Sequence, residues 1–523
     1  MKYKSNSDYW FPIIYGFFYL IFNYFHLSEN LSLSHDSIYY LIDITDNPYI
    51  LHPHHLLFFP VSSFLGKALI FIGINSVKES IALQSAAAGS IVLVTLYYIL
   101  RRNFSFTKYS AGLAVVLVSV TYGFWFYSLS IETYHLPLIF IFISLYFITK
   151  KEIDLQSVIL SAIFGGIAVL FHQLHGLFGL VVVLYLIING IKKNFRQIFI
   201  FSVVFNIVWI TGYIVAFIHL DLYSLDRITR WFFKYNYEVN SWASMNPSFI
   251  FKPFVGIIRS FVTIHPLFIS TEMSSIVTGI FANKEFSDDA YMVRNFSGIH
   301  FYFYAILSLI TAISVISLLV IKRKVIRSEF FTNLQIRIIF VFLVIYSIFF
   351  SFWDSSNLEF WIPQSILICI IASFAAGIIR NQIYKFIIPA IWVTSLFYIN
   401  YQYTIALVND KNNSYFYVEV SDAGNVLPDS SVIIYDKEWI AKPSYQIYSN
   451  LRFISIKETD EISFNINLHK TIDSVINMNK IAAVKSNLIN PDFDLTKYFY
   501  TIDTFGRSGF HIFDKRKMNK TKY

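Results

Sequence analysis

The residues best suited to chemistry in this sequence lie in one stretch near its N-terminal end, which contains no Lys or Arg. His35 and Asp36 come first, and His52, His54 and His55 follow around a proline. A carboxylate just outside a helix end can take a proton from a hydroxyl or bind a metal ion. Imidazoles beside a membrane surface can bind phosphate oxygens or a metal. Each group also has a purely structural alternative. Asp36 could be the N-cap of the following helix, and the histidines could be side chains that lie at the membrane interface.

Four further polar groups follow at the ends of apolar runs. They are Glu132 with Tyr134, His172 with His175, Arg227 with Arg230, and Glu359. Ionisable side chains in short loops between spans are costly unless they are paired or functional. The two arginines share a helix face and suit a lipid phosphate, although anchoring to anionic headgroups uses the same residue types. Interhelical hydrogen bonds are the alternative role for the histidines, and helix capping for Glu359.

The composition of the chain indicates a polytopic membrane protein. Of its 523 residues, 56% are hydrophobic and only 14% are charged. Apolar runs of about 17–23 residues recur, the length that crosses a hydrocarbon core. The net charge of +8 comes from Lys and Arg clustered between these runs, so it does not indicate a nucleic-acid partner. Cys369 is the only cysteine, which excludes an intramolecular disulfide.

We predict eleven membrane spans from the apolar runs. They cover residues 11–27, 80–100, 109–129, 134–149, 156–171, 174–189, 197–219, 301–321, 335–352, 361–379 and 385–407. The basic clusters between them place the N-terminus inside and the C-terminus outside. Two more apolar segments, 54–74 and 249–269, should stay on the outer side, because an extra crossing by either one would place the basic clusters that follow it outside. We expect the first to be an interfacial helix broken near Pro60.

The composition changes after the last predicted span. Polar residues become frequent, and short runs typical of β-strands appear at Ser431–Tyr435, Arg452–Ile456, Ile481–Val484 and Phe510–Phe513. We therefore expect a transmembrane domain at 1–407 and a small extracytoplasmic α/β domain at 408–523.

The order of these motifs resembles the GT-C superfamily of membrane glycosyltransferases, especially the bacterial relatives of protein O-mannosyltransferases. The matching motifs are Ser34-His35-Asp36, His52-Pro53-His54-His55, Glu132-Thr133-Tyr134, the helix that ends at His172 and His175, and Glu359-Phe360-Trp361-Ile362-Pro363. The resemblance covers roughly residues 1–380. The chain departs from the bacterial pattern at Tyr39, where a Glu is usual, and at His54 and His55, where Gly and Pro are usual.

The resemblance implies a GT-C-like fold of membrane helices and interfacial helices. It also implies transfer, with inversion, of a sugar from a polyprenyl-phosphate donor to a hydroxyl acceptor at the outer membrane face. Asp36 would be the base, and Glu132 would orient the acceptor or the sugar. Candidates for the donor phosphate are His52, His54, Arg227 and Arg230. The other substrate-binding candidates are His35, His55, Tyr134, His172, His175 and Glu359. A divalent cation is the one cofactor left open, and the partners are the lipid donor and membrane lipids.

Other functions stay open on the residues alone. A transporter or flippase would carry ionisable residues near the bilayer midplane, where this sequence has few. Two further alternatives are another lipid-linked envelope polysaccharide enzyme and a structural protein whose C-terminal domain binds a partner. Residue usage indicates a bacterial plasma membrane, with the N-terminus cytoplasmic. The enzyme hypothesis predicts that Asp36, Glu132 and His52 converge on one cavity.

Overall fold

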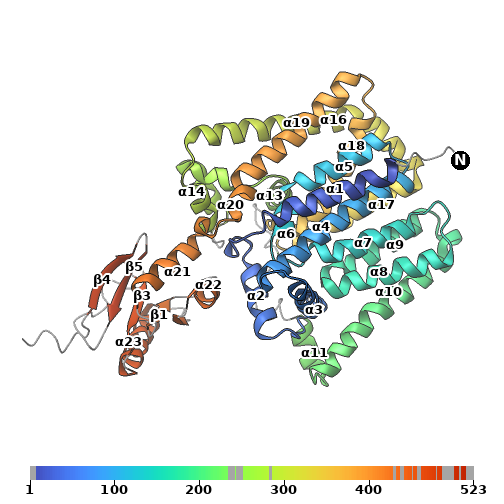
Figure 1. Cartoon of the computed structure of the whole chain (residues 1–523). Coiled ribbons are helices and arrows are strands. Elements are labelled where there is room, and N and C mark those ends of the chain that lie inside the picture. The colour runs from blue at the N-terminus through green and yellow to red at the C-terminus, as the bar shows by residue number, and fades with distance from the viewer. Residues whose placement is uncertain are drawn as a thin grey trace, which may run out of the picture. The chain divides into compact units, whose positions relative to one another are not determined.

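The chain folds into two compact units. The computed structural model describes residues 7–233, 242, 251–281, 286–427, 431–435, 441–449, 451–455, 461–478, 480–485, 500–505 and 508–513 (Figure 1). The first unit comprises Met1–Ser28, Asp43–Ala282 and Val293–Leu407. The second comprises Glu29–Ile42, Asn283–Met292 and Val408–Tyr523, so two short early segments pack with the C-terminal region.

Each predicted span contains an apolar helix in the first unit. Within the described residues, six helices are long and apolar enough to cross a membrane. They are α4 (Val77–Arg102), α10 (Ile191–His219), α16 (Gly298–Thr332), α17 (Leu334–Phe352), α18 (Ile362–Gly377) with the turn before it, and α19 (Gln382–Asn400). A further span is a pair bent by 62°, α5 (Lys108–Val120) and α6 (Tyr122–Leu129). Shorter apolar helices fill the remaining positions, namely α1 (Ser7–Tyr24), α7 (His135–Ile148), α8 (Leu155–Phe171) and α9 (Gly176–Ile188).

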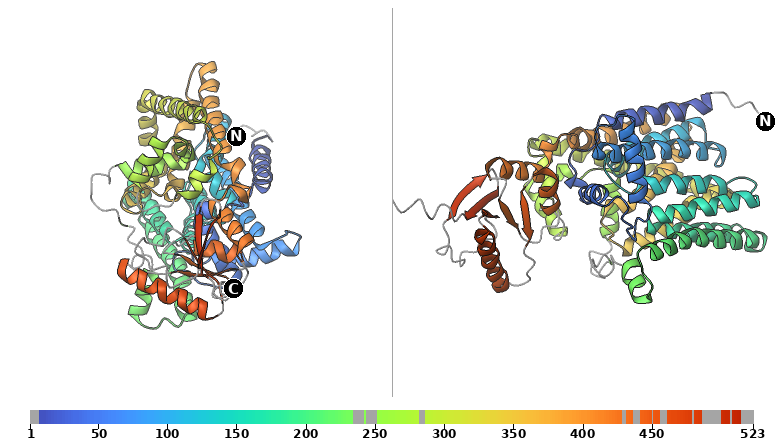
Figure 2. Two further views of the ribbon diagram at one scale, coloured as in Figure 1. Left: turned by 90° about the vertical axis from the view of Figure 1, so that its left-hand side faces the viewer. Right: turned by 60° about the horizontal axis from the view of Figure 1, so that its bottom comes forward.

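Helices α7, α8, α9 and α10 lie alongside one another (Figures 1 and 2). Small residues allow α8 and α10 to approach closely. A Cβ atom added to Gly166 of α8 would lie 2.7 Å from Cβ of Val208, and one added to Gly212 of α10 would lie 2.5 Å from Leu170. A larger residue at either position would push the helices apart. This contact fixes the C-terminal end of α8, where His172 follows.

The first segment predicted to lie along the interface forms a continuous helix, α3 (Phe58–Phe71). Pro60 falls in its first turn, where the missing N–H has no helical partner to lose. The predicted break near Pro60 is therefore wrong. Phe64 is 72% exposed and Phe71 is 91% exposed, an uncovered apolar surface typical of interfacial helices.

The second such segment forms a shorter helix, α13 (Phe251–Phe261). Its eleven residues extend about 16 Å, which is too short to cross a hydrocarbon core of about 30 Å. Other short helices lie among the described residues between α10 and α16. They are α11 (Leu225–Phe232), a 3₁₀ turn at His265–Ile269, α14 (Thr271–Ile280) and α15 (Ser287–Met292), of which α15 belongs to the second unit.

The second unit is built around a five-stranded sheet with strand order β2-β1-β3-β5-β4. Its strands are β1 (Val432–Tyr435), β2 (Arg452–Ser455), β3 (Ala482–Lys485), β4 (Tyr500–Phe505) and β5 (Ser508–Phe513). Strands β2, β1 and β3 are parallel, and β5 pairs antiparallel with both β3 and β4. Four of these strands lie at the predicted runs.

Helices cover both faces of this sheet. Ile433 of β1 packs with α21 (Tyr415–Val426) and α22 (Ala441–Tyr448) on one face. Its neighbours Val432 and Ile434 point to the other face and pack with α23 (Glu461–Asn477). Alternating residues of one strand thus contribute to two apolar cores, as the period of a strand requires. The predicted C-terminal α/β fold is confirmed.

Candidate functional site

The His-Pro loop before α3 is held in place by the ends of α8 and α10. The hydroxyl of Tyr213 on α10 donates to the carbonyl of Pro53 at 2.6 Å. The backbone N–H of Gln173 donates to the carbonyl of His54 at 2.9 Å, and Leu57 N–H donates to Leu170 at 2.9 Å. These bonds join the His-Pro loop to segments of α8 and α10 that lie more than a hundred residues later in the sequence.

The result is a cluster of five histidine rings, which we call the histidine cluster. It consists of His52, His54, His55, His172 and His175. The ring centroids of His52 and His55 lie 5.6 Å apart, and those of His55 and His172 lie 4.7 Å apart. His172 and His175 follow at 5.7 Å. The structure thus brings together two groups that the sequence only placed on the same side of the membrane.

Burial keeps the centre of the histidine cluster uncharged. Burial lowers the pKa of His55 and of His172 well below the usual value, and the neighbouring imidazoles lower it further by repulsion. The Nδ1 atom of His172 accepts a hydrogen bond from Leu174 N–H at 3.4 Å. A neutral His172 therefore carries its proton on Nε2, which leaves an N–H donor for an anionic oxygen.

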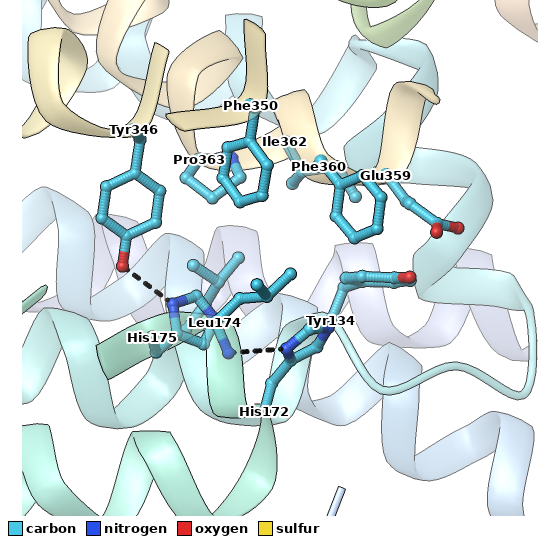
Figure 3. A pocket seen from close by; sticks show the side chains of 11 residues that line it. Tyr134, His172, Leu174, His175, Tyr346, Phe350, Glu359, Phe360, Ile362 and Pro363 are labelled. Atoms are coloured by element: carbon cyan, nitrogen blue, oxygen red, sulfur yellow. Dashed lines mark hydrogen bonds between the residues drawn. The ribbon is translucent and has the colours of Figure 1, made fainter. Parts of the chain in front are cut away.

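The cluster adjoins a pocket between the 3₁₀ turn η2 (Gln173–His175), α17 and the start of α18 (Figure 3). Its polar lining residues are Tyr134, His172, His175, Tyr346 and Glu359. The Nδ1 atom of His175 and the hydroxyl of Tyr346 are 3.1 Å apart and hydrogen bonded. The free space is about 20 Å³, enough for about one water molecule. A sugar could enter only if these side chains moved apart.

A buried carboxylate, Glu132, a partly buried one, Glu359, and one arginine lie around Tyr127 of α6. The Tyr127 hydroxyl donates to Glu359 Oε2 at 3.3 Å, and Asn357 Nδ2 donates to Glu359 Oε1 at 2.7 Å. The charges of Glu359, Glu132 and Arg259 all act on Tyr127. The predicted residues Glu132 and Glu359 thus both lie near Tyr127, together with Arg259.

Glu132 occupies the turn between α6 and α7 and is completely buried. Its backbone carbonyl accepts a hydrogen bond from Ser85 Oγ at 3.4 Å, which ties the turn to α4. A buried carboxylate loses its hydration and is retained where other groups compensate or where it has a function.

Arg259 of α13 is a candidate that the sequence analysis did not identify. Its Nη1 atom donates to the carbonyl of Ser356 at 3.1 Å, and its guanidinium lies 5.8 Å from the ring centre of Phe281. Its Nε atom is buried without a hydrogen-bond partner. The only signal in the sequence was one arginine within an apolar outer segment. A guanidinium with an unused buried donor is suited to an anionic ligand.

The structure does not place Arg227 and Arg230 among the residues that line this pocket. Both are exposed on α11. Arg230 Nε pairs with Asp226 at 3.0 Å, and Arg227 Nη1 donates to the carbonyl of Asp221 at 3.4 Å. The apolar side of α11 packs Trp231 against Tyr213. Lys234, which follows Arg230 at helical spacing in the sequence, lies outside the described residues.

Asp36 is the first residue of α2 (Asp36–Asp46) and lies in the second unit. His35 before it has φ of 59°, a left-handed conformation that is strained for a residue with a side chain. Burial raises the pKa of Asp36 to about 6, and a hydrogen bond of 3.3 Å from the Tyr40 hydroxyl partly opposes this shift. Because Asp36 and Glu132 belong to different units, their convergence stays a prediction.

No set of three or more His, Cys, Asp or Glu residues in the described part of the chain is arranged to hold a metal ion. The residues that could bind an anion are instead neutral imidazoles and Arg259.

The comparisons with known proteins agree with the resemblance seen in the sequence. Residues 52–215 match the family described as dolichyl-phosphate-mannose-protein mannosyltransferase. ArnT from Cupriavidus metallidurans, solved bound to undecaprenyl phosphate, has a similar structure with a TM-score of 0.58 and 10% identity; the match covers 96% of this chain and 97% of ArnT. No curated protein sequence matches the chain.

A second solved structure has the same architecture. The oligosaccharyltransferase of Archaeoglobus fulgidus, tethered to an acceptor peptide, matches with a TM-score of 0.50 and 11% identity; the match covers 95% of this chain and 74% of that protein. Identities this low establish the fold only. The chain is thus a multi-pass membrane protein with the fold of the GT-C glycosyltransferases, and its segment 52–215 matches the mannosyltransferase family within them.

Proposed function

We propose that this protein is an inverting glycosyltransferase that moves a sugar from a polyprenyl-phosphate donor to a hydroxyl acceptor at the outer face of a bacterial plasma membrane. One observation supports this proposal most strongly. The segment that matches the mannosyltransferase family begins at His52 and contains the whole histidine cluster together with Glu132 and Tyr134. The family likeness and the clustered polar side chains therefore point to the same part of the molecule.

The leaving group of the proposed reaction is a lipid phosphate. The ArnT structure of similar fold was solved with undecaprenyl phosphate, which supports a donor of this kind. The imidazole N–H groups of the histidine cluster and the guanidinium of Arg259 are the candidates that would stabilise the phosphate as negative charge develops on it. Arg227 and Arg230 are exposed, so we propose for them only a contact with lipid headgroups or with the distal part of the donor.

Asp36 would take the proton from the acceptor hydroxyl while the hydroxyl oxygen attacks the anomeric carbon. The bond from this carbon to the phosphate oxygen breaks in the same displacement, which inverts the configuration. A carboxylate whose pKa is about 6 is a stronger base than an exposed one and is still ionised at neutral pH. His35 precedes the base, and Glu132 and Glu359 would orient the sugar or the acceptor. We assign no step to a divalent cation.

Binding of the donor should take up protons. The pKa of His55 and His172 is low because of burial and mutual repulsion. A bound phosphate would supply the opposite charge and raise both pKa values. The histidine cluster would then respond to the lipid phosphate by becoming positively charged.

The test is binding of undecaprenyl phosphate to the purified protein in lipid nanodiscs. We expect His172→Ala to weaken binding about tenfold or more, because a hydrogen bond to a charged group contributes about 1.5–3 kcal/mol. His219→Ala removes an exposed histidine at the end of α10 and is the matched control. Failure of the folded wild type to bind, or equal binding by His172→Ala, would refute the proposed phosphate site.

A further inference from the structure

A buried acidic pair in the second unit has no part in the reaction proposed above. Asp288 and Asp289 lie in the first turn of α15 and are only 4% and 9% exposed. Buried carboxylates are destabilising unless hydrogen bonds replace their hydration. The groups that surround Asp288 therefore indicate why it is there.

Asp288 connects three segments that are distant in the sequence. Its Oδ1 atom accepts a hydrogen bond of 2.6 Å from the backbone N–H of Tyr415, at the start of α21. Helix α15 contacts the Ser32–Ser34 turn, and the hydroxyls of Ser32 and Ser414 act on the Asp288 carboxyl group. Those two hydroxyls are hydrogen bonded to each other at 2.9 Å. The carboxyl group of Asp288 thus holds the early segment and α21 together.

A second set of bonds fixes the same early segment. The backbone N–H groups of Glu29 and Asn30 both donate to the carbonyl of Val408, at 2.7 and 3.1 Å. Leu31 between them and Ser32 is 1% exposed. Ser32 Oγ donates to the side chain of Asn30 at 3.0 Å. The chain is therefore anchored to the C-terminal region at Glu29, Asn30 and Ser32.

This anchor lies only four residues before Asp36. A single 3₁₀ turn, Ser32–Ser34, separates them, and a hydrogen bond joins the hydroxyls of Ser34 and Ser37. His35 is held with φ of 59°. Backbone strain of this kind costs about 1–3 kcal/mol and persists only where the surroundings enforce it. A displacement of Ser32 would therefore reach Asp36 directly.

We propose that Asp288 is a positioning residue for Asp36, and that the C-terminal unit serves to hold the segment that carries this base. The inference rests on the proposed function, because it assigns Asp36 the role of base. It extends that function by giving the second unit a role in the reaction. Asp288 itself touches neither substrate in this proposal.

Asparagine and alanine should have different effects at this position. An Asn side chain keeps an oxygen that can accept the hydrogen bond from Tyr415 N–H. Burial raises the pKa of Asp288 to about 6, so a neutral side chain of the same shape removes an unfavourable charge at neutral pH. Alanine removes the connection altogether.

The experiment measures the mobility of the early segment by thiol labelling. Cys369 is the only cysteine, so a Leu33→Cys reporter in a Cys369→Ala background gives one labelled position. We expect Asp288→Ala to raise the maleimide labelling rate about tenfold and to lower kcat for sugar transfer while the donor KM stays unchanged. Asp288→Asn should label and turn over like the parent. Asp473→Ala removes an exposed carboxylate on α23 and is the control.

Ser32→Ala is the milder second variant if Asp288→Ala fails to fold, and we expect faster labelling from it as well. An unchanged labelling rate in a folded variant would overturn the proposal whatever the activity. Faster labelling with an unchanged kcat would also overturn it, because the segment would then be anchored without positioning the base. The two proposals can fail separately, because labelling requires no turnover. A wild type that transfers no sugar would refute the proposed function. The maleimide labelling rates would still decide whether Asp288 holds the segment.

Discussion

Replacing Tyr40 by Phe should move the pH dependence of sugar transfer. The Tyr40 hydroxyl donates to Asp36 Oδ2 at 3.3 Å. This bond favours the ionised carboxylate, so it lowers a pKa that burial raises to about 6. Without the hydroxyl, no hydrogen bond from residue 40 lowers the pKa of Asp36, so burial should raise this pKa further.

The size of the shift follows from the length of the bond. A hydrogen bond of 3.3 Å lies beyond the usual range, so we assign it about 1 kcal/mol. Because one pKa unit corresponds to about 1.36 kcal/mol, the expected shift is about 0.7 units. The base must be ionised to act, so activity falls as pH drops through its pKa. Near pH 6, Tyr40→Phe should therefore be about threefold slower than wild type, with equal rates at high pH.

The assay is the pH profile of kcat/KM for transfer from a polyprenyl-phosphate sugar. Tyr49→Phe removes the hydroxyl of an exposed tyrosine and is the control. A wild-type acid limb near pH 4 would show that Asp36 is not a buried base. An identical limb in Tyr40→Phe and wild type, or a limb moved to lower pH, would refute the role given to the hydrogen bond.

Three more predictions concern the first unit. Affinity for undecaprenyl phosphate should rise as the pH falls toward the lowered pKa values of His55 and His172, because the bound phosphate raises both values. An affinity that stays constant or falls in titration calorimetry would contradict this. Arg259→Gln should raise the donor KM or lower kcat at least tenfold, whereas Arg323→Gln, at an exposed position of α16, should do neither. Asn400→Ala should destabilise the fold by at least about 2 kcal/mol, since Asn400 bonds to Val120, Phe261 and Thr263 at 2.8–3.0 Å; an unchanged thermal midpoint would show that these bonds are dispensable.

The helices of the first unit could be predicted because a hydrocarbon core requires long apolar runs. The same reasoning gave a wrong break near Pro60, because proline disrupts a helix only beyond its first turn. The strand Tyr500–Phe505 was missed because its sequence mixes polar and apolar residues without a clear pattern. It pairs antiparallel with β5, the next strand in the chain, and forms an edge of the sheet.

The histidines of the cluster could be named from the sequence, but their arrangement in space could not. His52 and His172 join one cluster because hydrogen bonds of the His-Pro loop to the end of α8 bring them together. No local spacing encodes that contact. Arg259 was overlooked because one arginine in an apolar segment also fits a headgroup anchor. The exposure of Arg227 and Arg230 depends on which side of α11 packs against Tyr213, and the sequence pattern alone did not decide this.

Sugar transfer by the purified protein in lipid tests the central proposal most directly. The assay offers a panel of polyprenyl-phosphate sugars to the wild type, to Asp36→Asn, and to Asp46→Asn, which alters an exposed carboxylate at the other end of α2. We predict that the wild type and Asp46→Asn consume one donor with inversion at the anomeric carbon, and that Asp36→Asn does not. Full activity of Asp36→Asn would contradict the assigned base. A folded wild type that consumes no donor would contradict the proposed reaction.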